Sequence, residues 1–339
     1  MDLSATRVKI GLTAMPGIVI CLCGFVAGCS DGPDASARWE HSLIGLYEAA
    51  LSNDGRFAVV SSIGGNTGYW DLRANTKIYS WRHNDSDDAD ILHIAIAPNN
   101  SHVITADARS FVVWDVSTGR ADGYWSVDAN IVDVAIANDG RFVLIGLADG
   151  RAIHINQQSR RRLEVVAHRH ERVTSVDLTA DGVIAATGGN DGRVMVWNSI
   201  TGAEIHAFEH ASRIAIIKID PSGQRILTAD DQGNAFIWDL ASGNKLATLN
   251  LENHQHVISA ASFSHDGSQL LLGFPGTDVR LWDSSSGQLI GSWRTSNRIK
   301  GWVPQGSTVY AVAINEQENT VMAESSNGLG LAWPNVSGY

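Results

Sequence analysis

The chain has 339 residues, of which 44% are hydrophobic and only 18% charged, and its formal net charge at pH 7 is −11. This length and apolar content suffice for a large core, whereas the acidic balance argues against a nucleic-acid-binding surface. All three cysteines precede residue 30, so the rest of the chain has no thiols with which to form a disulfide.

The first predicted element is a signal peptide over residues 1–28. Two basic residues precede an almost uncharged apolar run that ends at Gly28, which is the layout of a secretory signal. A membrane-spanning helix is the alternative, but the run has about the minimum length for one and contains Pro16. Residues 26–29, Val-Ala-Gly-Cys, also resemble the bacterial lipobox, which makes Cys29 the lipid-modified first residue of the mature chain.

The lipobox interpretation predicts a protein held at the cell envelope through the lipid on Cys29, with residues 29–36 as a short tether. Ser30 follows the cysteine. In lipoproteins of Gram-negative bacteria an aspartate at that place is associated with retention in the inner membrane. We therefore expect the outer membrane.

From residue 37 onward the chain is a repeat. Short runs of alternating apolar residues are separated by glycine-containing turns, a pattern that indicates four short antiparallel strands in each unit. Most units end with a tryptophan that an aspartate often follows. The corresponding positions, 41 to 51 residues apart, are Trp70, Trp114, Ile155, Trp197, Trp238, Trp282 and Trp333.

A unit of about 42 residues with an Asp-Gly turn and a terminal Trp-Asp resembles the WD40 repeat, and the resemblance covers residues 37–333. Seven such units imply an all-β, seven-bladed WD40-type β-propeller that occupies residues 37–339. Ile155 in the third unit and Pro334 after the last tryptophan depart from the motif. These two blades are therefore assigned by spacing alone.

The last unit has too few residues after Trp333 for a fourth strand. Residues 37–42, ARWEHS, contain an aromatic residue, a charged residue and a histidine in the same order as residues 81–83 and 208–210, which belong to predicted fourth strands. We therefore expect this N-terminal strand to complete the last blade and join the two ends of the chain. Such closure removes an exposed sheet edge.

WD40 blades are often braced by a hydrogen-bonded tetrad of His, Ser or Thr, Asp and Trp, which satisfies polar groups buried between strands. Only the fourth blade shows all four residues, and the resemblance implies a structural role for them: His168 (or His170), Thr187, Asp191 and Trp197. The fifth blade lacks the aspartate, because its residues are His210, Thr228, Gln232 and Trp238.

We name the two faces of the ring by their connections. The bottom face carries the turns from first to second and from third to fourth strands, and the top face carries the remaining loops. A tether of eight residues, 29–36, reaches at most ~25 to 30 Å, so we expect the bottom face to lie against the membrane. Arg160, Arg161 and Arg162, in the turn from third to fourth strand of blade three, are candidate membrane-facing residues. A solvated turn is the alternative.

Two loops on the top face exceed the repeat, and such loops often carry function. Their candidate partner-binding residues are Asp85, Asp87, Asp88 and Asp90 before blade two, and Arg298, Lys300 and Trp302 before blade seven. A tryptophan beside basic residues has the composition of a binding hot spot, unless it packs back onto the blade. The four aspartates could bind calcium, but their spacing matches no dedicated calcium loop, which favours a charged surface loop.

Enzyme signatures are missing from the sequence, which has no GxSxG, P-loop or HExxH motif. In each of the pairs His168/His170 and His254/His256, the two-residue spacing would place both imidazoles on one face of a strand, where they could coordinate a metal ion. Because both pairs lie where a WD40 blade places its structural histidine, we expect no metal and no cofactor.

These patterns predict a non-catalytic protein-interaction platform, a scaffold or accessory subunit that binds an envelope protein partner. One alternative is an envelope enzyme, such as a quinone-cofactor dehydrogenase or a polysaccharide lyase. The other is a small-ligand sensor that uses the central channel. Mostly apolar inner strands, such as HIAIA at 93–97, argue against the enzyme, which would need a funnel lined with charged or metal-binding residues.

Overall fold

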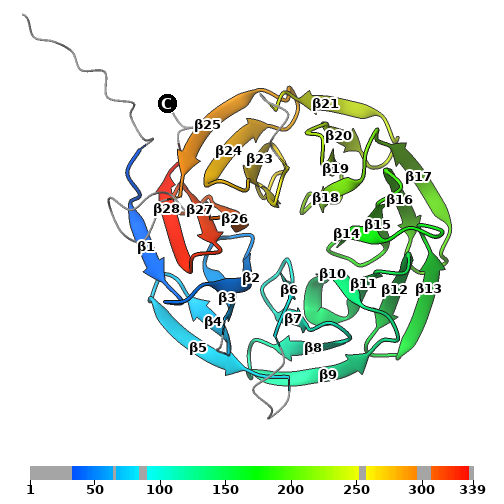
Figure 1. Ribbon diagram of the computed structural model, residues 1–339, viewed down its shortest axis with the longest axis horizontal. Coiled ribbons are helices and arrows are strands. Elements are labelled where there is room, and N and C mark those ends of the chain that lie inside the picture. Colours follow the sequence, from blue (N-terminus) through cyan, green and yellow to red (C-terminus); the bar gives the residue numbers. More distant parts are fainter. Residues whose placement is uncertain (1–32, 64–65, 84–89, 252–256, 296–306, 336–339) are drawn as a thin grey trace, which may run out of the picture. The chain divides into compact units, whose positions relative to one another are not determined.

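The computed structural model describes residues 33–63, 66–83, 90–251, 257–295 and 307–335. The chain divides into two units, residues 1–31 and residues 32–339, and every described residue belongs to the second. In this second unit seven sheets of four antiparallel strands surround a central channel (Figure 1). The predicted seven-bladed β-propeller is confirmed. No described helix is long and apolar enough to cross a membrane.

Each blade is a four-stranded meander that runs from the channel outward. Blade one consists of β2 (Leu46–Leu51), β3 (Phe57–Ser62), β4 (Thr67–Asp71) and β5 (Thr76–Trp81). Blade two consists of β6 (His93–Ile96), β7 (His102–Ala106), β8 (Ser110–Asp115) and β9 (Arg120–Ser126). Blade three consists of β10 (Ile131–Ile136), β11 (Phe142–Leu147), β12 (Arg151–Asn156) and β13 (Arg161–Val166), with the short 3-10 turn η1 (Asn138–Gly140) between β10 and β11.

The remaining blades repeat this plan. Blade four consists of β14 (Val173–Leu178), β15 (Ile184–Gly189), β16 (Arg193–Asn198) and β17 (Glu204–Glu209). Blade five consists of β18 (Ile214–Ile219), β19 (Arg225–Asp230), β20 (Ala235–Asp239) and β21 (Lys245–Leu249). Blade six consists of β22 (Ala260–Phe263), β23 (Gln269–Gly273), β24 (Asp278–Asp283) and β25 (Leu289–Arg294). Blade seven consists of β26 (Val309–Asn315), β27 (Thr320–Ser325), β28 (Leu329–Pro334) and β1 (Ala37–Glu40).

The N-terminal strand closes the ring, as the sequence predicts. β1 pairs antiparallel with β28, from Ala37 opposite Ala332 to Glu40 opposite Leu329, and Figure 1 shows the blue strand beside the red one. Because β28 runs toward the bottom face, β1 begins at that face. The two ends of the repeat are thereby held in one sheet, and a free edge on β28 is avoided.

The core lies between neighbouring blades. There the apolar side chains on one sheet pack against those of the next sheet, as in the cluster shared by blades two and three. The side chains of three tryptophans are almost completely buried: Trp197, Trp282 and Trp333. Each stabilises its blade by burying a large apolar surface. Ile155 occupies the tryptophan position in blade three and is buried as well, next to Val143 of β11. Blade three therefore keeps the propeller geometry without the tryptophan.

The tight turns on the bottom face depend on glycine. Gly182, in the turn between β14 and β15, has a φ of 75°, a conformation that residues with a Cβ rarely adopt. A Cβ at this position would also collide with the ring of Phe142 from blade three. The Asp-Gly turn of the repeat is therefore set both by backbone conformation and by contact with the preceding blade.

Candidate functional site

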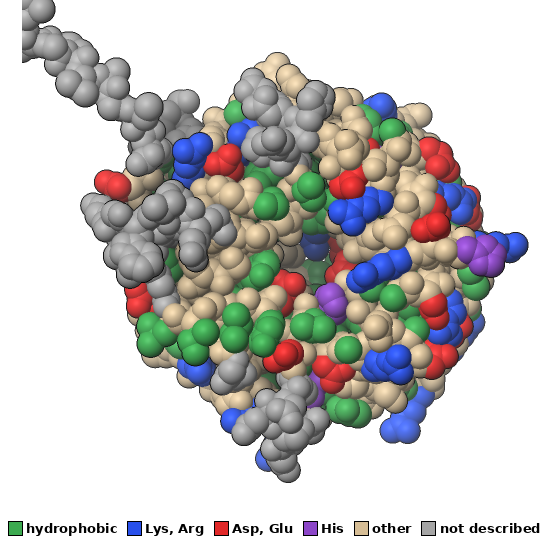
Figure 2. Space-filling view, viewed as in Figure 1, with side chains coloured by type: hydrophobic (Ala, Val, Ile, Leu, Met, Phe, Trp, Pro, Cys, Tyr) green, Lys and Arg blue, Asp and Glu red, His purple; other side chains and the backbone are tan. Residues whose placement is uncertain are grey.

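The inner strands enclose a channel whose cavity has a volume of about 400 Å³. Figure 2 shows it as the hollow at the centre of the ring. The expectation of mostly apolar walls fails on the side of blades one to five, where the lining includes the ionisable residues Glu48, His93, Asp133, Asp177 and Lys218. These residues could not be recognised from the sequence, because each is isolated among the mainly apolar residues of its strand or accompanied only by small hydroxyl residues.

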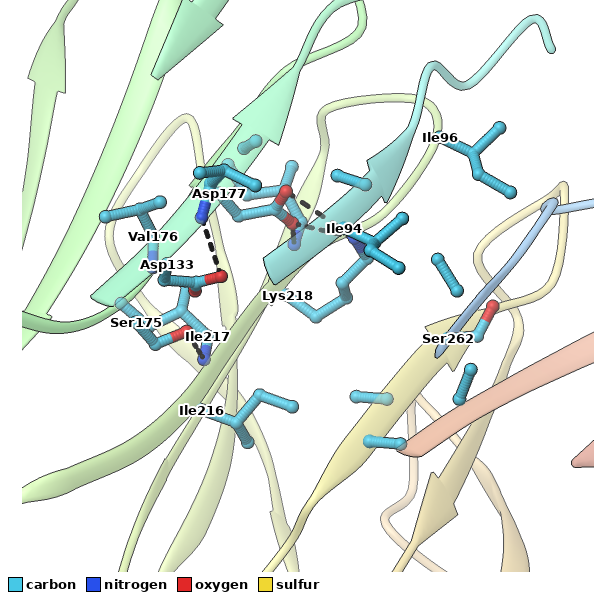
Figure 3. Close-up of a pocket in the computed structure, with 18 of the residues that line it drawn as sticks. Ile94, Ile96, Asp133, Ser175, Val176, Asp177, Ile216, Ile217, Lys218 and Ser262 are labelled. Atoms are coloured by element: carbon cyan, nitrogen blue, oxygen red, sulfur yellow. Dashed lines mark hydrogen bonds and ion pairs between the residues drawn. The ribbon is translucent and has the colours of Figure 1, made fainter. Parts of the chain in front are cut away.

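Two of these carboxylates and a serine link neighbouring blades (Figure 3). Asp133 of blade three accepts hydrogen bonds of 2.8 Å from the backbone N–H groups of Val134 and Val176. Ser175 Oγ and Asp177 Oδ2 of blade four accept from Ile217 N at 3.1 Å and Ile219 N at 2.7 Å. An inner strand is a sheet edge, so its unpaired N–H groups need such acceptors. These side chains therefore join the blades.

Burial gives the channel carboxyl groups unusual acidities. It raises the pKa of Asp133 to about 6, although the N–H groups of Val176 and Val134 oppose the shift. Burial also raises the pKa of Glu48 to about 8; the hydrogen bond from Ala49 N lowers it, and the charge of Asp133 adds to the increase. At pH 7 Glu48 therefore holds its proton, whereas Asp133 is mostly ionised.

Lys218 supplies a positive charge to the same channel. Its Nζ lies 3.4 Å from Asp177 Oδ2, and Figure 3 shows both side chains directed toward each other. On the side of blades six and seven the lining has no carboxylate, histidine or lysine: most of it is alanine, serine and apolar residues, and Tyr310 adds one phenol. Nowhere in the described ranges do three or more His, Cys, Asp or Glu side chains converge as a metal site.

An apolar patch lies on the top face over blade one. Leu43 and Ile44, in the connection from β1 to β2, are 81% and 75% exposed. Ile63, also exposed, lies beside them, because its N–H donates to Gly45 O at 3.1 Å. We call Leu43, Ile44 and Ile63 the apolar patch. Figure 2 shows hydrophobic side chains gathered over this blade.

Most of the predicted partner-binding residues lie outside the described residues: Asp85, Asp87, Asp88, Arg298, Lys300 and Trp302. Asp90 is described, and its exposed side chain lies beside Tyr47 of β2. The pKa of Tyr47 is raised by desolvation, and next by the charge of Asp90 and a hydrogen bond to it. The structure thus places Asp90 next to blade one.

Tetrads occur in blades two and five, which corrects the prediction that only blade four has all four residues. In blade two, Thr105 Oγ1 lies 2.7 Å from His83 Nε2 and accepts from Trp114 Nε1 at 2.8 Å. His83 Nδ1 lies 3.4 Å from Asp107 Oδ2. The aspartate was missed because it follows the threonine by two residues instead of four. Residues two or four positions apart lie on the same side of a strand, so an aspartate at either distance from the threonine can reach the imidazole.

Blade five repeats the two hydrogen bonds to threonine, and Asp230, rather than Gln232 at the predicted position, brings a carboxylate near the histidine. His210 Nε2 and Trp238 Nε1 each lie 2.8 Å from Thr228 Oγ1. His210 Nδ1 lies 3.5 Å from Asp230 Oδ2. The missing carboxylate is therefore supplied from the end of β19.

In blade four the structure brings together only part of the predicted set. His168 Nδ1 lies 2.9 Å from Asp191 Oδ1, whereas His170 is exposed in the loop. Within the described residues, Thr187 Oγ1, Trp197 Nε1 and His168 Nε2 are buried without a hydrogen-bond partner. Sequence similarity to the tetrad therefore does not by itself produce its hydrogen bonds.

The three consecutive arginines lie on the bottom face but not all in the turn. Arg160 ends the turn with a φ of 55°, while Arg161 and Arg162 already belong to β13. Arg162 Nη2 lies 3.0 Å from Glu164 Oε2, and Arg161 Nη2 donates to Ile200 O at 3.1 Å. All three arginines are exposed. The turn is thus shorter than predicted.

Comparison with known proteins agrees with this fold. A family model described as WD40, "WD domain, G-beta repeat", matches residues 160–198. "Transcription initiation factor TFIID subunit 5" of Caenorhabditis elegans is 24% identical over 194 residues, 57% of this chain and 30% of that protein. "Guanine nucleotide-binding protein subunit beta" of Arabidopsis thaliana is 24% identical over 203 residues, 55% of this chain and 54% of that protein.

A longer match is to the "Guanine nucleotide-binding protein subunit beta" of Nicotiana tabacum, 22% identical over 283 residues, 77% of this chain and 70% of that protein. The chain spans about half or less of the length of the first two relatives. All three are named as subunits, and neither they nor the family model indicate a catalytic family. Together with the seven four-stranded sheets, these matches show that the chain has the fold of a seven-bladed WD40-type β-propeller.

Proposed function

We propose that this protein is a non-catalytic platform that binds a protein partner through the top face of its propeller. The apolar patch is the observation that carries this proposal, because Leu43 and Ile44 are exposed by more than 70%. Grouped apolar side chains of this kind on a loop surface are typical of protein interfaces. The similarity to proteins named as subunits supports the same function.

We extend the proposed partner surface to the acidic residues before blade two. Asp90 lies beside Tyr47, which follows Ile44 by three residues in the chain, and would supply a charged group near the apolar patch. An apolar centre with a polar, charged margin is the usual composition of an interface. The sequence alone supports adding the other candidate residues to this surface: Asp85, Asp87, Asp88, Arg298, Lys300 and Trp302.

The place of action that we propose is a bacterial cell envelope, with the outer membrane favoured. The proposal rests on the signal-like segment 1–28 and on the lipobox cysteine, Cys29. β1 begins at the bottom face, so a tether that enters it from Cys29 would direct the top face away from the membrane. The proposed partner is then an envelope protein, whose identity the sequence does not specify.

Affinity purification from detergent-solubilised membranes tests the platform function. The full chain is compared with a variant that carries Leu43→Asp and Ile44→Asp, and with the control Leu289→Asp on the outer strand β25, where the leucine is 53% exposed. We expect one protein to co-purify with the natural chain and with the control but not with the double variant. A partner retained by all three chains would contradict the proposed surface.

The channel favours a second candidate function, a sensor of a small polar ligand. Its cavity of about 400 Å³ carries Lys218 and Glu48 as well as uncharged walls, a combination that suits a small molecule with a charged group. Thermal unfolding in the presence of sugars, amino acids and quinones tests this function. A ligand that raises the melting temperature, but not in a Lys218→Met variant, would support it.

A further inference from the structure

A smaller cavity lies on the bottom face, between blades three and four. Its volume is about 200 Å³, enough for a group of several non-hydrogen atoms. Its walls come from the ends of β11, β12 and β13 and from the turn after β16. The lining residues that matter below are Arg141, Phe142, His154, Asn156 and Arg161.

Blade one has the same arrangement of rings and cation at this place, and it serves as an internal reference. There the Arg56 guanidinium lies 4.8 Å from the centre of the Phe57 ring, which stacks on Tyr69. In blade three the Arg141 guanidinium lies 4.9 Å from the centre of the Phe142 ring, which stacks on His154 with ring centres 5.2 Å apart. The two sites differ in what neutralises the arginine.

In blade one a carboxylate pairs with the arginine, and in blade three that carboxylate is missing. Asp71 Oδ2 lies 3.5 Å from Arg56 Nη2. Asp71 pairs with Phe57 across the second and third strands of blade one, and at the equivalent position of blade three Asn156 pairs with Phe142. Arg141 therefore faces an amide that carries no charge, and no carboxylate pairs with it within the described ranges.

The same register shows that an aspartate recurs at one bottom-face position in four of the seven blades but not in blades three and four. The last position of the third strand holds an aspartate in blades one, two, five and six: Asp71, Asp115, Asp239 and Asp283. It holds Asn156 and Asn198 in blades three and four and Pro334 in blade seven. Among the described residues, the Arg161 side chain donates to the neutral Ile200 O. A locally positive site thus stands on a chain with a net charge of −11.

His154 is the second sign of a ligand. Its register holds buried apolar or aromatic residues in the other six blades: Tyr69, Val113, Val196, Ile237, Leu281 and Ala332. His154 is only 4% exposed, and its Nε2 has no hydrogen-bond partner among the described residues. An unsatisfied buried nitrogen costs about 1–3 kcal/mol, which a bound hydrogen-bonding group would recover.

The protonation of His154 indicates which group that is. Burial lowers the pKa of His154 to about 4, so the imidazole is neutral at pH 7, and the ring interacts with the backbone of Gly182. The hydrogen bond with Gly182 raises the pKa of His154, so the imidazole is its donor and Gly182 O its acceptor. Because Nε2 has no partner among the described residues, the donating nitrogen is Nδ1. Nε2 then holds a lone pair and needs a donor such as a hydroxyl.

We propose that this cavity binds a phosphate group that also carries a hydroxyl. Arg141 and Arg161 contact the anionic oxygens, for which a guanidinium is the preferred partner, and His154 Nε2 accepts from the hydroxyl. Inorganic phosphate satisfies both requirements at neutral pH, and so does a phosphoglycerol lipid headgroup. Sulfate carries no proton at this pH and satisfies only the first. The site does not depend on the proposed partner surface of the top face.

Calorimetric titration of the full chain in neutral detergent with inorganic phosphate tests the site, with sulfate at equal ionic strength as the reference. We expect phosphate to bind about tenfold more tightly than sulfate. Asn156→Asp restores the carboxylate of the other blades and should weaken phosphate binding about tenfold or more. The control Asp71→Asn, at the same register of blade one, should leave the affinity unchanged.

The variant His154→Val separates the role of the histidine from that of the fold. Valine occupies this register in blades two and four, so the variant should fold and melt at a temperature no lower than the natural chain. It should bind phosphate and sulfate equally. Equal affinities for phosphate in the natural chain, Asn156→Asp and His154→Val would overturn the proposal.

A lipid arm distinguishes the two sources of the phosphate. The melting temperature is measured in mixed micelles that contain phosphatidylglycerol, with diacylglycerol as the phosphate-free control. A rise with phosphatidylglycerol alone, lost in Asn156→Asp, assigns the site to a lipid headgroup, and tight binding of inorganic phosphate assigns it to a soluble ligand. If neither probe binds the natural chain, the proposed site does not exist.

Discussion

At the scale of single residues, equivalent positions in different blades have different consequences. Thr105 and Thr187 occupy the same register on the second strands of blades two and four, and both are fully buried. The Thr105 hydroxyl contacts His83 and Trp114, whereas the Thr187 hydroxyl has no partner among the described residues. Their sequences give no sign of this difference, because it depends on how the histidine loop of each blade is placed.

This difference predicts opposite effects of one substitution. Thr105→Val should lower the free energy of unfolding by about 1–3 kcal/mol, because His83 and Trp114 lose their shared partner. Thr187→Val should be neutral or stabilising, because it replaces an unsatisfied hydroxyl by a methyl group. Urea unfolding of both variants measures the effect. Equal losses of stability would show that the network of blade two has no special role.

The buried carboxyl group of Glu48 predicts a dependence of stability on pH. Its pKa is about 8 in the folded chain, above the ordinary value of 4.5, so between these values the folded chain holds a proton that the unfolded chain has lost. The free energy of unfolding therefore falls as the pH rises through this window. The variant Glu48→Gln has an amide at this position, which does not bind or release a proton in this pH range.

Relative to the natural chain, Glu48→Gln should therefore gain stability as the pH rises from about 5 to about 8. The unfolding midpoint in urea, measured at several pH values for both chains, gives the comparison. Ala50→Ser, on the same strand, provides a variant without a titrating group. A constant difference between Glu48→Gln and the natural chain at all pH values would exclude a raised pKa.

At the scale of the elements, the strands were predictable and several side-chain roles were not. Alternation and the spacing of the tryptophans predicted the number of blades, because both depend on the local period of a four-stranded unit. The extent of the turn before β13 was not predictable. Its end depends on the positive φ of Arg160, and three identical side chains conceal where β13 begins. Likewise, Asp133 caps an N–H group of the next blade, a contact that no local pattern records.

The closing strand provides a prediction at this scale. Deletion of residues 37–42 removes β1 from blade seven and exposes the edge of β28, so the melting temperature of the whole ring should fall by at least several degrees. Deletion of residues 33–35, which precede the strand, should leave it unchanged. If both deletions melt like the natural chain, β1 does not hold the ring closed.

At the scale of the whole molecule, the sequence predicted the ring and its closure but not the distribution of charge around it. The carboxylates, the histidine and the lysine of the channel lie on blades one to five, and the bottom-face aspartate is replaced in blades three, four and seven. Such asymmetry arises from single substitutions at equivalent positions. It becomes visible only when the blades are superposed by register.

The envelope location gives a further prediction. In a Gram-negative host, Cys29→Ala should leave a folded but unprocessed or unanchored chain, because the cysteine is the proposed site of lipid attachment. Fractionation of cells and the mass of the chain's N-terminal peptide report the result. A mature chain that remains in the membrane fraction without this cysteine would refute lipid anchoring at Cys29.

The most direct test of the interaction platform is site-specific photo-crosslinking in intact cells. A photoreactive residue is placed at Ile44 in the apolar patch or, as the control, at Leu289 on the outer strand β25. The proposed function predicts a discrete cross-linked protein from position 44 and none from position 289. A cross-link of equal yield from both positions, or from position 289 alone, would contradict a partner surface on the top face over blade one.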